Sequence, residues 1–413
     1  MAINLDDYQL EAISRLKVGS ILVGGVGSGK SRTGIGFYFL QNGGCIEPFE
    51  RMKPVPQDLY IITTARKRDK GEWLGDLAPF ELSPDQMVSG YPCKVVIDSW
   101  NNIAKYRDVE DAFFIFDEQR VVGYGAWTKN FLNITKHNDW ILMTATPGDC
   151  WEDYIPVFIA NGFYRNKTDF ERQHCYFNPY VNYRQVAGYI EQGRLIRYRN
   201  SILVDMEYHS KAIPHNEPIV CDYNRQLYRQ VLQDRWDPFE NCPIENGSKL
   251  CYLLRKVVNS DPSRIARICD LLNRHPKMIV FYNYDYELEI LRHAEYPIDL
   301  TLAELNSHNH DDVPDSDAWL YLVQYAAGAE AWNCITTDAM TFYSQNYSYK
   351  TMTQAKGRID RRNSSFNELY YYHLKSNASI DYAIAKSLKE KKDFNERRFY
   401  SGFFGDSRKK LAL

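Results

Sequence analysis

Short apolar runs alternate with longer polar segments along most of this chain. The runs are apolar at consecutive positions, as in Phe113-Phe114-Ile115-Phe116. A strand that is apolar on both faces is typical of a parallel sheet covered by helices on both sides. The first segment carries apolar residues at helical spacing, at Leu10, Ile13 and Leu16, which favours a helix. The pattern predicts an α/β lobe over residues 1–150, with strands at 20–23, 59–64, 94–97, 112–116 and 140–143.

The same alternation resumes in the last third of the chain and predicts a second α/β lobe over residues 263–396. Residues 151–262 differ, because they are rich in Tyr, Arg and Asn, follow a helical period and contain few strand-like runs. We therefore expect a helical insertion between two α/β lobes. Residues 397–413 form a basic tail, which we expect to be a surface segment. The strands expected in the second lobe are 278–282, 319–324, 339–343 and 368–374.

Composition agrees with several domains and excludes some classes of protein. A chain of 413 residues is too long for one ordinary hydrophobic core. The net charge of −3 means that any contact with nucleic acid must come from local basic patches. The cysteines are scattered without a Cys-x-x-Cys pair, which argues against a disulfide framework or a zinc site. No apolar run approaches the ~20 residues of a membrane span, so we expect a cytoplasmic protein that does not contact a membrane.

The stretch from Gly24 to Ser31 carries the strongest chemical signal in the chain. It reads Gly-Gly-Val-Gly-Ser-Gly-Lys-Ser between a predicted strand and a predicted helix, which is the context of a phosphate-binding loop. Glycines allow consecutive backbone N–H groups to surround an anion, and the helix N-terminus adds positive charge. Lys30 is expected to reach the phosphates and the Ser31 hydroxyl to complete a Mg²⁺ shell. The loop residues expected to bind nucleotide are Gly25, Gly27, Ser28, Gly29, Lys30 and Ser31.

Two acidic residues follow the strand at 112–116. Asp117 and Glu118 come at the carboxyl end of a strand, which is where open α/β sheets bind ligands. We expect Asp117 to hold Mg²⁺ through water and Glu118 to polarise the attacking water. The pair therefore predicts hydrolysis of the nucleotide as well as binding.

Three other groups of residues are weaker candidates, and each has a simpler interpretation. Gln9 could contact an adenine edge or be a helix-surface residue. The strand at 59–64 ends in Thr63 and Thr64 and leads into Arg66, groups that could contact a nucleic-acid backbone or start a solvated helix. Aromatic and basic residues alternate over 183–199; they could stack on a nucleic-acid strand, although we favour a helical insertion with one basic face.

Two arginines near the end of the second lobe suggest a further contribution to catalysis. Arg358 and Arg361 are three positions apart, so on a helix they share a face. Two guanidinium groups presented by the second lobe could reach the γ-phosphate held by the first. Such an arginine finger raises hydrolysis by roughly 10³–10⁵ and makes hydrolysis depend on closure of the lobes.

Taken in order, these motifs resemble those of superfamily 2 helicases, and most closely the Swi/Snf-type DNA translocases. Further marks of that group are Trp73, the stretch 254–262 before the second lobe, and Gln354-Ala355-Lys356-Gly357-Arg358-Ile359-Asp360-Arg361. The resemblance covers nearly the whole chain. It rests on residues 8–9, 24–31, 63–64, 117–118, 144–147, 324–330 and 354–361.

This resemblance implies two RecA-like P-loop NTPase lobes, with ATP and Mg²⁺ as cofactors and DNA as partner. It also implies that Gln354 contacts the nucleotide and that Gly328 contacts nucleic acid. The expected function is a DNA-dependent ATPase or helicase that moves along DNA, in replication, recombination or repair, with replication proteins as further partners. A compact motor without added domains looks like those of phage or mobile-element replication modules, which places it in a bacterial or infected-host cytoplasm.

Two alternatives stay open at the level of sequence. The track could be RNA, because the motifs contact mostly backbone. The chain could also be an ATP-dependent clamp or scaffold that binds DNA without travelling. The sequence departs from its relatives at Arg120, where they often have His, and at residues 330–333, where they are richer in glycine.

Overall fold

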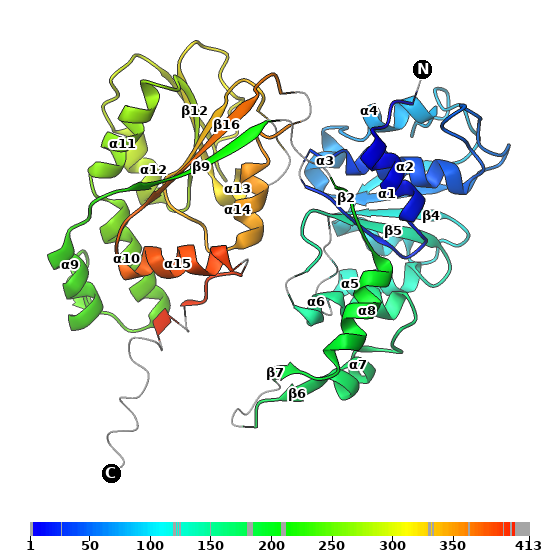
Figure 1. The fold of residues 1–413 in the computed structure, drawn as a ribbon, viewed down its shortest axis with the longest axis horizontal. Helices are drawn as coiled ribbons and strands as arrows, with labels where there is room; N and C mark the ends of the chain where they lie inside the picture. Colours follow the sequence, from blue (N-terminus) through cyan, green and yellow to red (C-terminus); the bar gives the residue numbers. More distant parts are fainter. Residues whose placement is uncertain are drawn as a thin grey trace. The chain divides into compact units, whose positions relative to one another are not determined.

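The computed structural model divides the chain into two compact units, Met1–His209 and Ser210–Leu413 (Figure 1). Each unit has its own sheet and its own hydrophobic core. The structure describes residues 3–25, 27–118, 121, 123, 125–148, 150–179, 185–207, 212–328, 332, 334–361, 364–390, 392–396 and 399–400.

The first unit is built on a six-stranded sheet in the order β3-β2-β4-β5-β1-β8. Every neighbouring pair of strands in this sheet is parallel. Consecutive apolar residues form these strands because both faces of the sheet are covered. The strands are β1 (Ile21–Val23), β2 (Leu59–Thr63), β3 (Val95–Ser99), β4 (Phe113–Asp117), β5 (Asp139–Thr144) and β8 (Leu203–Asp205).

Two clusters of buried residues lie on the two faces of this sheet. Along β4, Phe113 and Ile115 belong to one cluster, and Phe114 and Phe116 belong to the other, as the alternation of a strand requires. Residues of α1, α2 and α4 contribute to the first cluster, and residues of α5 to α8 contribute to the second. The helices are α1 (Asp7–Arg15), α2 (Lys30–Gln41), α3 (Ala65–Asp69), α4 (Leu74–Leu77), α5 (Ala126–Ile134), α6 (Trp151–Ala160), α7 (Lys167–His174) and α8 (Gln192–Ile202), with 3-10 turns η1 (Ala78–Phe80) and η2 (Trp100–Tyr106).

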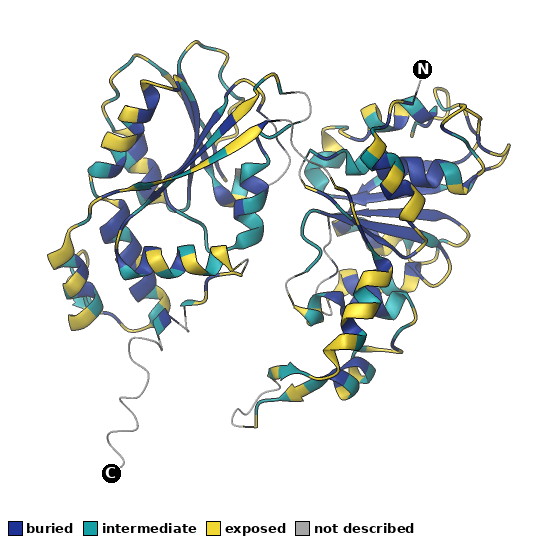
Figure 2. Cartoon of the chain, in the orientation of Figure 1, coloured by how far each residue is buried: buried dark blue, intermediate teal, exposed yellow. Residues whose placement is uncertain are grey.

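The second unit repeats this plan with a different connectivity. Its six strands follow the order β13-β14-β12-β15-β16-β9, and all neighbouring pairs are parallel. Figure 2 shows the central strands of both sheets as buried and the outer sides of the helices as exposed. The strands are β9 (Ile213–Val220), β12 (Lys277–Tyr282), β13 (Thr301–Leu305), β14 (Trp319–Gln324), β15 (Ala339–Phe342) and β16 (Glu368–Lys375).

Helices also cover both faces of the second sheet. Buried residues of α14 join the cluster on one face, and buried residues of α11 and α12 join the cluster on the other. A further cluster lies between α10 and α15. The helices are α9 (Arg225–Arg229), α10 (Gly247–Asn259), α11 (Ser263–Leu272), α12 (Asp285–Arg292), α13 (Tyr325–Gly328), α14 (Tyr349–Lys356) and α15 (Ser379–Lys389), with a π-helical turn η3 (Gln230–Asp234) after α9.

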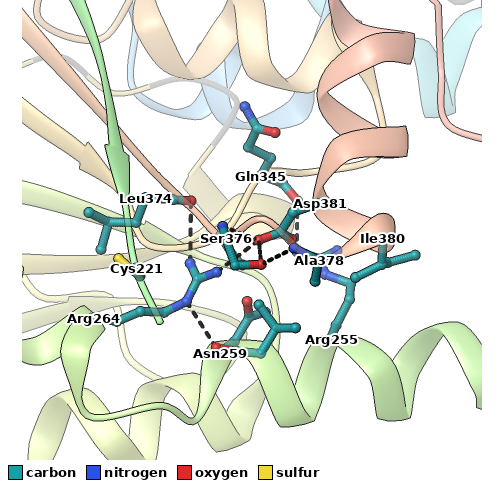
Figure 3. Close-up of polar contacts among 12 residues, drawn as sticks. Cys221, Arg255, Asn259, Arg264, Gln345, Leu374, Ser376, Ala378, Ile380 and Asp381 are labelled. Atoms are coloured by element: carbon teal, nitrogen blue, oxygen red, sulfur yellow. Dashed lines mark hydrogen bonds and ion pairs between the residues drawn. The ribbon is translucent and has the colours of Figure 1, made fainter. Parts of the chain in front are cut away.

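A buried arginine ties α11 to the end of β16 and to α15 (Figure 3). Arg264 is fully buried, and its guanidinium donates to the carbonyls of Val258 (3.2 Å), Leu374 (3.3 Å) and Tyr343 and to the Asp381 carboxylate (3.1 Å). Asp381 also accepts from the backbone N–H of Ser376, at 2.7 Å. Since buried charges are costly without partners, this network fixes the three elements against one another.

The predicted fold class, two α/β lobes on parallel sheets, is confirmed. The segment 151–262, expected as one helical insertion, is shared between the units: β8 joins the first sheet and β9 joins the second. This segment also contains two short antiparallel hairpins, β6 (Cys175–Phe177) with β7 (Val186–Tyr189) and β10 (Trp236–Asp237) with β11 (Cys242–Pro243). Within the described part of the chain, no helix is long and apolar enough to cross a membrane.

Candidate nucleotide site

The loop between β1 and α2 has the backbone that its glycines allow. Gly27 and Gly29 have φ angles of 84° and 78°, in the left-handed region that residues with a Cβ rarely adopt. α2 begins at Lys30, and the first N–H groups of a helix have no partner within it. The Lys30 ammonium donates to the carbonyl oxygens of Gly24 and Gly25, at 2.7 and 2.8 Å. The lysine charge therefore lies against the loop itself.

Helix α1 supports this loop through two consecutive residues. The Tyr8 hydroxyl donates to the Ser28 carbonyl at 3.0 Å. Gln9 is fully buried, and its amide nitrogen donates to the Gly29 carbonyl at 3.2 Å and to the Thr33 hydroxyl at 3.1 Å. The Gln9 amide oxygen accepts from a backbone N–H of α1's own N-terminus. Gln9 thus positions the loop here, and the expected adenine contact stays a prediction.

The acidic pair lies at the same edge of the sheet as the loop. Asp117 is the last residue of β4 and pairs with Met143, while Val23, the last residue of β1, pairs with the next residue of β5, Thr144. Adjacent strands are about 4.8 Å apart, so only the width of β5 separates the two strand ends. Glu118 follows with a φ of 61°. Such backbone strain in a residue other than glycine is typical of functional sites.

The Asp117 carboxylate is buried and has two strong donors within the protein. One of its oxygens accepts from the Thr63 hydroxyl at 2.7 Å and from the Lys67 ammonium at 2.8 Å. The Lys67 nitrogen also lies 3.9 Å from a Glu118 oxygen. Burial lowers the pKa of Lys67, but the charges of Asp117 and Glu118 outweigh burial and hold that pKa above its usual value. Lys67 is thus the cation that neutralises the acidic pair in this structure.

This arrangement changes the interpretation of the segment after β2. Arg68 pairs with Asp98 at 2.9 Å. The Arg66 carbonyl accepts from the Lys70 backbone N–H at 3.0 Å, and its guanidinium has no hydrogen-bond or ion-pair partner among the described residues. Thr63, expected to contact nucleic acid, is fully buried with its hydroxyl on Asp117. Thr64 caps α3 by accepting from the Lys67 backbone N–H. The nucleic-acid contact of Thr64 and Arg66 stays a prediction.

The residues present fit a magnesium ion. Mg²⁺ prefers hard oxygen ligands and keeps several waters, and Ser31 and Asp117 supply a hydroxyl and a carboxylate beside the loop. The buried Ser28 hydroxyl has no hydrogen-bond partner among the described residues. The chemistry of these donors is what the sequence led us to expect.

The Thr144 side chain shapes the loop at the end of β5. Its hydroxyl accepts from the backbone N–H of Thr146 at 3.0 Å and donates to the Thr146 carbonyl at 3.1 Å. These bonds close a turn within the loop. The Thr146 hydroxyl is buried and has no hydrogen-bond partner among the described residues.

The predicted arginine pair of the second unit lies just beyond a helix. α14 ends at Lys356, so Arg358 lies in the turn that follows and Arg361 in irregular chain beyond it. The expectation of a shared helix face is wrong. Both guanidinium groups nevertheless donate to the carbonyl of Trp332, at 2.8 and 3.5 Å. The chain turns after α14. The two guanidinium groups therefore lie close together on the same carbonyl oxygen.

The remaining predicted residues are placed as follows. Gln354 is buried on α14, and Gly328 is the last residue of α13. The basic and aromatic segment is helical only in part, since Val186–Tyr189 form β7 and α8 begins at Gln192. Tyr198 of α8 stacks on Phe163 with ring centroids 4.3 Å apart. Some members of the predicted motifs lie outside the described part of the chain: Val26, Arg120, Tyr183, Arg184, Ala329, Glu330, Ala331 and Asn333.

Sequence comparison finds no matching protein family and no matching curated protein. Among solved structures, the chain is similar to the SWI2/SNF2 ATPase core of Sulfolobus solfataricus in complex with double-stranded DNA. The TM-score is 0.41 at 14% sequence identity, and the alignment covers 99% of this chain and 95% of that one. The functional interpretation therefore rests on the residues of this chain.

Proposed function

We propose that this chain is an ATPase that nucleic acid stimulates and that couples hydrolysis to movement along DNA. The observation that carries the proposal is the location of the phosphate loop and the Asp117–Glu118 pair at one edge of one parallel sheet. Ligands of open α/β sheets bind at that edge. A loop alone would support nucleotide binding, whereas a loop with an adjacent acidic pair supports hydrolysis.

Within this proposal, each residue of the first unit has a distinct task. Lys30 moves from the loop carbonyls to the β- and γ-phosphates. Ser31 and Asp117 would hold Mg²⁺, which when bound supplies positive charge to the phosphate oxygens. Glu118 accepts hydrogen bonds from the attacking water and orients it. Lys67 leaves Asp117 when that carboxylate takes up its role with the metal.

We assign the second unit a role in accelerating the reaction. Arg358 and Arg361 stabilise the negative charge that develops on the γ-phosphate. Gln354 contacts the nucleotide in the same arrangement. These roles rest on the sequence resemblance and on the convergence of both guanidinium groups on the Trp332 carbonyl.

DNA is the proposed track, with Thr64, Arg66 and Gly328 among its contacts. The support from the structure is that the Arg66 guanidinium has no ion-pair partner among the described residues. It belongs to α3, the short helix that also carries Lys67, so a nucleic-acid phosphate could approach this helix. Movement on duplex DNA, with a role in replication, recombination or repair, follows the resemblance described above. RNA is the competing track.

The test is ATP hydrolysis by the full chain without nucleic acid and with single-stranded DNA, duplex DNA, forked DNA or RNA. We expect strong stimulation by a DNA form and little by RNA. Lys30→Ala serves as the control, since it should abolish hydrolysis under every condition. Basal turnover that no nucleic acid changes would leave an ATPase but overturn the motor, and preferential stimulation by RNA would overturn the choice of DNA.

A triplex-displacement assay distinguishes movement from binding. A third strand annealed to duplex DNA is displaced by a protein that travels, and we expect displacement that requires ATP. Hydrolysis stimulated by DNA without displacement would favour a clamp that stays in place.

A further inference from the structure

A cavity of about 490 Å³ opens within the second unit between the edge of its sheet and two helices. Strands β9 and β16 form one wall, and α14 and α15 form the others. Figure 1 shows β9 and β16 side by side in this unit. A cavity of this size lies within the range of about 300–1,000 Å³ that small-molecule sites occupy.

Positive charge is concentrated around this cavity. Lys356, Lys375 and Lys389 line it, and no Asp or Glu is among its lining residues. Lys356 donates to the amide oxygen of Asn216 at 2.6 Å, which is a neutral partner. Among the described residues, the side-chain ammonium groups of Lys375 and Lys389 have no hydrogen-bond or ion-pair partner.

The carboxylates closest in sequence do not balance this charge. Glu390, beside Lys389, is paired with Lys392 at 3.2 Å. Glu217 lies between two lining residues of β9, so strand alternation directs it to the opposite face of the sheet. Asp393 accepts from the backbone N–H of Tyr349 at 2.7 Å and so caps the start of α14. The three ammonium groups therefore share a space with no ionised partner of their own.

His373 gives a second sign that a polar ligand belongs here. It lines the cavity, and its Nδ1 is buried without a hydrogen-bond partner. Burial, followed by the charges of Lys356 and Lys375, lowers the pKa of His373 to about 3. A buried polar atom without a partner is costly, and a ligand that reaches Nδ1 would remove that cost.

Apolar side chains form part of the remaining walls, beside Gln345, Tyr349 and Thr353. Met352 from α14 and Pro218 from β9 line the cavity together with Ala385 and Leu388 from α15. Each helix contributes positions three or four apart, which is the spacing of a single helix face. Ligand sites commonly combine apolar walls with a few polar groups that fix orientation.

We propose that this cavity binds a small organic anion, with a phosphate or carboxylate group held by the lysines and an apolar body against Met352 and Leu388. The site belongs entirely to the second unit and is separate from the phosphate loop.

The probe for this proposal is 1-naphthyl phosphate, which joins a dianion to an aromatic ring. Its binding to the full chain is measured by titration calorimetry, in wild type and in Lys30→Ala, which removes the phosphate-loop lysine. We expect 1-naphthyl phosphate to bind wild type and Lys30→Ala with the same dissociation constant. Inorganic phosphate and 1-naphthol should each have a dissociation constant at least tenfold larger. Binding lost in Lys30→Ala would assign the probe to the phosphate loop and overturn the proposal.

Two variants locate the binding. Lys375→Met keeps the aliphatic part of the side chain and removes its charge. Lys389→Glu changes an exposed residue, so this second variant should fold as wild type does. We expect each to weaken 1-naphthyl phosphate binding about tenfold. The matched control is Lys386→Met, an exposed lysine on α15 outside the cavity lining, which should bind as wild type does. Equal binding in all three variants, or displacement of the probe by duplex DNA, would overturn the proposal.

Discussion

Asp117 is neutralised in this structure by a protein cation at the position where we expect a metal to act. The Lys67 ammonium lies 2.8 Å from the carboxylate oxygen that Thr63 also contacts. A lysine and a divalent cation compete for the same negative charge. Lys67 therefore stabilises the first unit without nucleotide and opposes metal binding at the same time.

This competition predicts two opposite effects of Lys67→Met. Without metal, the variant should lose about 1.5–3 kcal/mol of stability, the range for a hydrogen bond to a charged group, because the buried carboxylate keeps only Thr63. With MgADP, the stability of the variant should return toward that of wild type, because the metal can bind Asp117 without displacing a lysine. The measurement is the thermal midpoint in EDTA and in MgADP.

Arg68→Met is the control for that experiment. It removes a neighbouring cation of the same helix that pairs with Asp98 and has no contact with Asp117. We expect the shift caused by MgADP to be larger than wild type in Lys67→Met and equal to wild type in Arg68→Met. A MgADP shift unchanged in Lys67→Met would show that the lysine does not compete with the metal.

The phosphate loop and the acidic pair were predictable from single residues because each is a run of adjacent residues at a strand end. The pairing of Lys67 with the acidic pair was not predictable. Three cations in succession indicate a basic surface, and only the orientation of the short helix α3 decides that Lys67 turns to the acids and Arg68 to Asp98. The contact of the Thr63 hydroxyl with Asp117 was not predictable for the same reason, since that hydroxyl could face either side of the strand end.

At the scale of elements, α2 packs closely on its sheet. A Cβ at Gly34 would lie 2.7 Å from the Met143 sulfur and 3.3 Å from a terminal carbon of Ile141, both on β5 and fully buried. Gly34→Ala should therefore lower the stability of the first unit by about 1–3 kcal/mol, as overpacking does. Denaturant titration with a probe in the first unit measures this loss.

Gly75→Ala is the matched control, because the same change on α4 meets no atom within 4 Å. It should leave stability unchanged or raise it by about 0.4–1 kcal/mol, since alanine restricts the unfolded chain. If both variants were equally stable, α2 would have room to shift away from β5.

In the second unit, Arg264→Met removes a cation with four acceptors (Figure 3). The change leaves Asp381 and three carbonyls short of a donor in the core, so we expect a loss of about 3–5 kcal/mol, typical of breaking a buried ion pair. Arg267→Met on the same helix removes an exposed pair with Asp270 and should cost less than about 1 kcal/mol. A similar denaturation midpoint for both variants would contradict this role of Arg264.

The central strands were predictable because burial on both faces leaves consecutive apolar residues, as in β4 and β12. The strands β8, β9 and β13 were missed. β9 alternates exposed and partly buried positions and contains two prolines. An edge strand tolerates proline, but in the sequence these prolines look like a break between helices. β8 has three residues, too few for any period to show.

At the scale of the whole molecule, the candidate groups for hydrolysis are divided between two units. The phosphate loop and the acidic pair belong to the first unit, and the two arginines belong to the second. A nucleotide could therefore bind to the first unit alone and yet be hydrolysed slowly. This division gives the molecule a way to make hydrolysis depend on its conformation.

Arg361→Ala tests that dependence. The residues that bind ATP in the first unit are unchanged, so the affinity for a fluorescent ATP analogue should stay within a few-fold of wild type. The single-turnover rate constant for hydrolysis with DNA should fall by a factor of roughly 10³–10⁵, the contribution of an arginine finger. Arg267→Ala, which removes an exposed arginine of the same unit, should hydrolyse ATP normally. Normal turnover in Arg361→Ala would show that Arg361 takes no part in the chemical step. A group that interacts only with the charge of the transition state leaves the ground-state complex intact. Loss of ATP binding in this variant would therefore make Arg361 a binding residue.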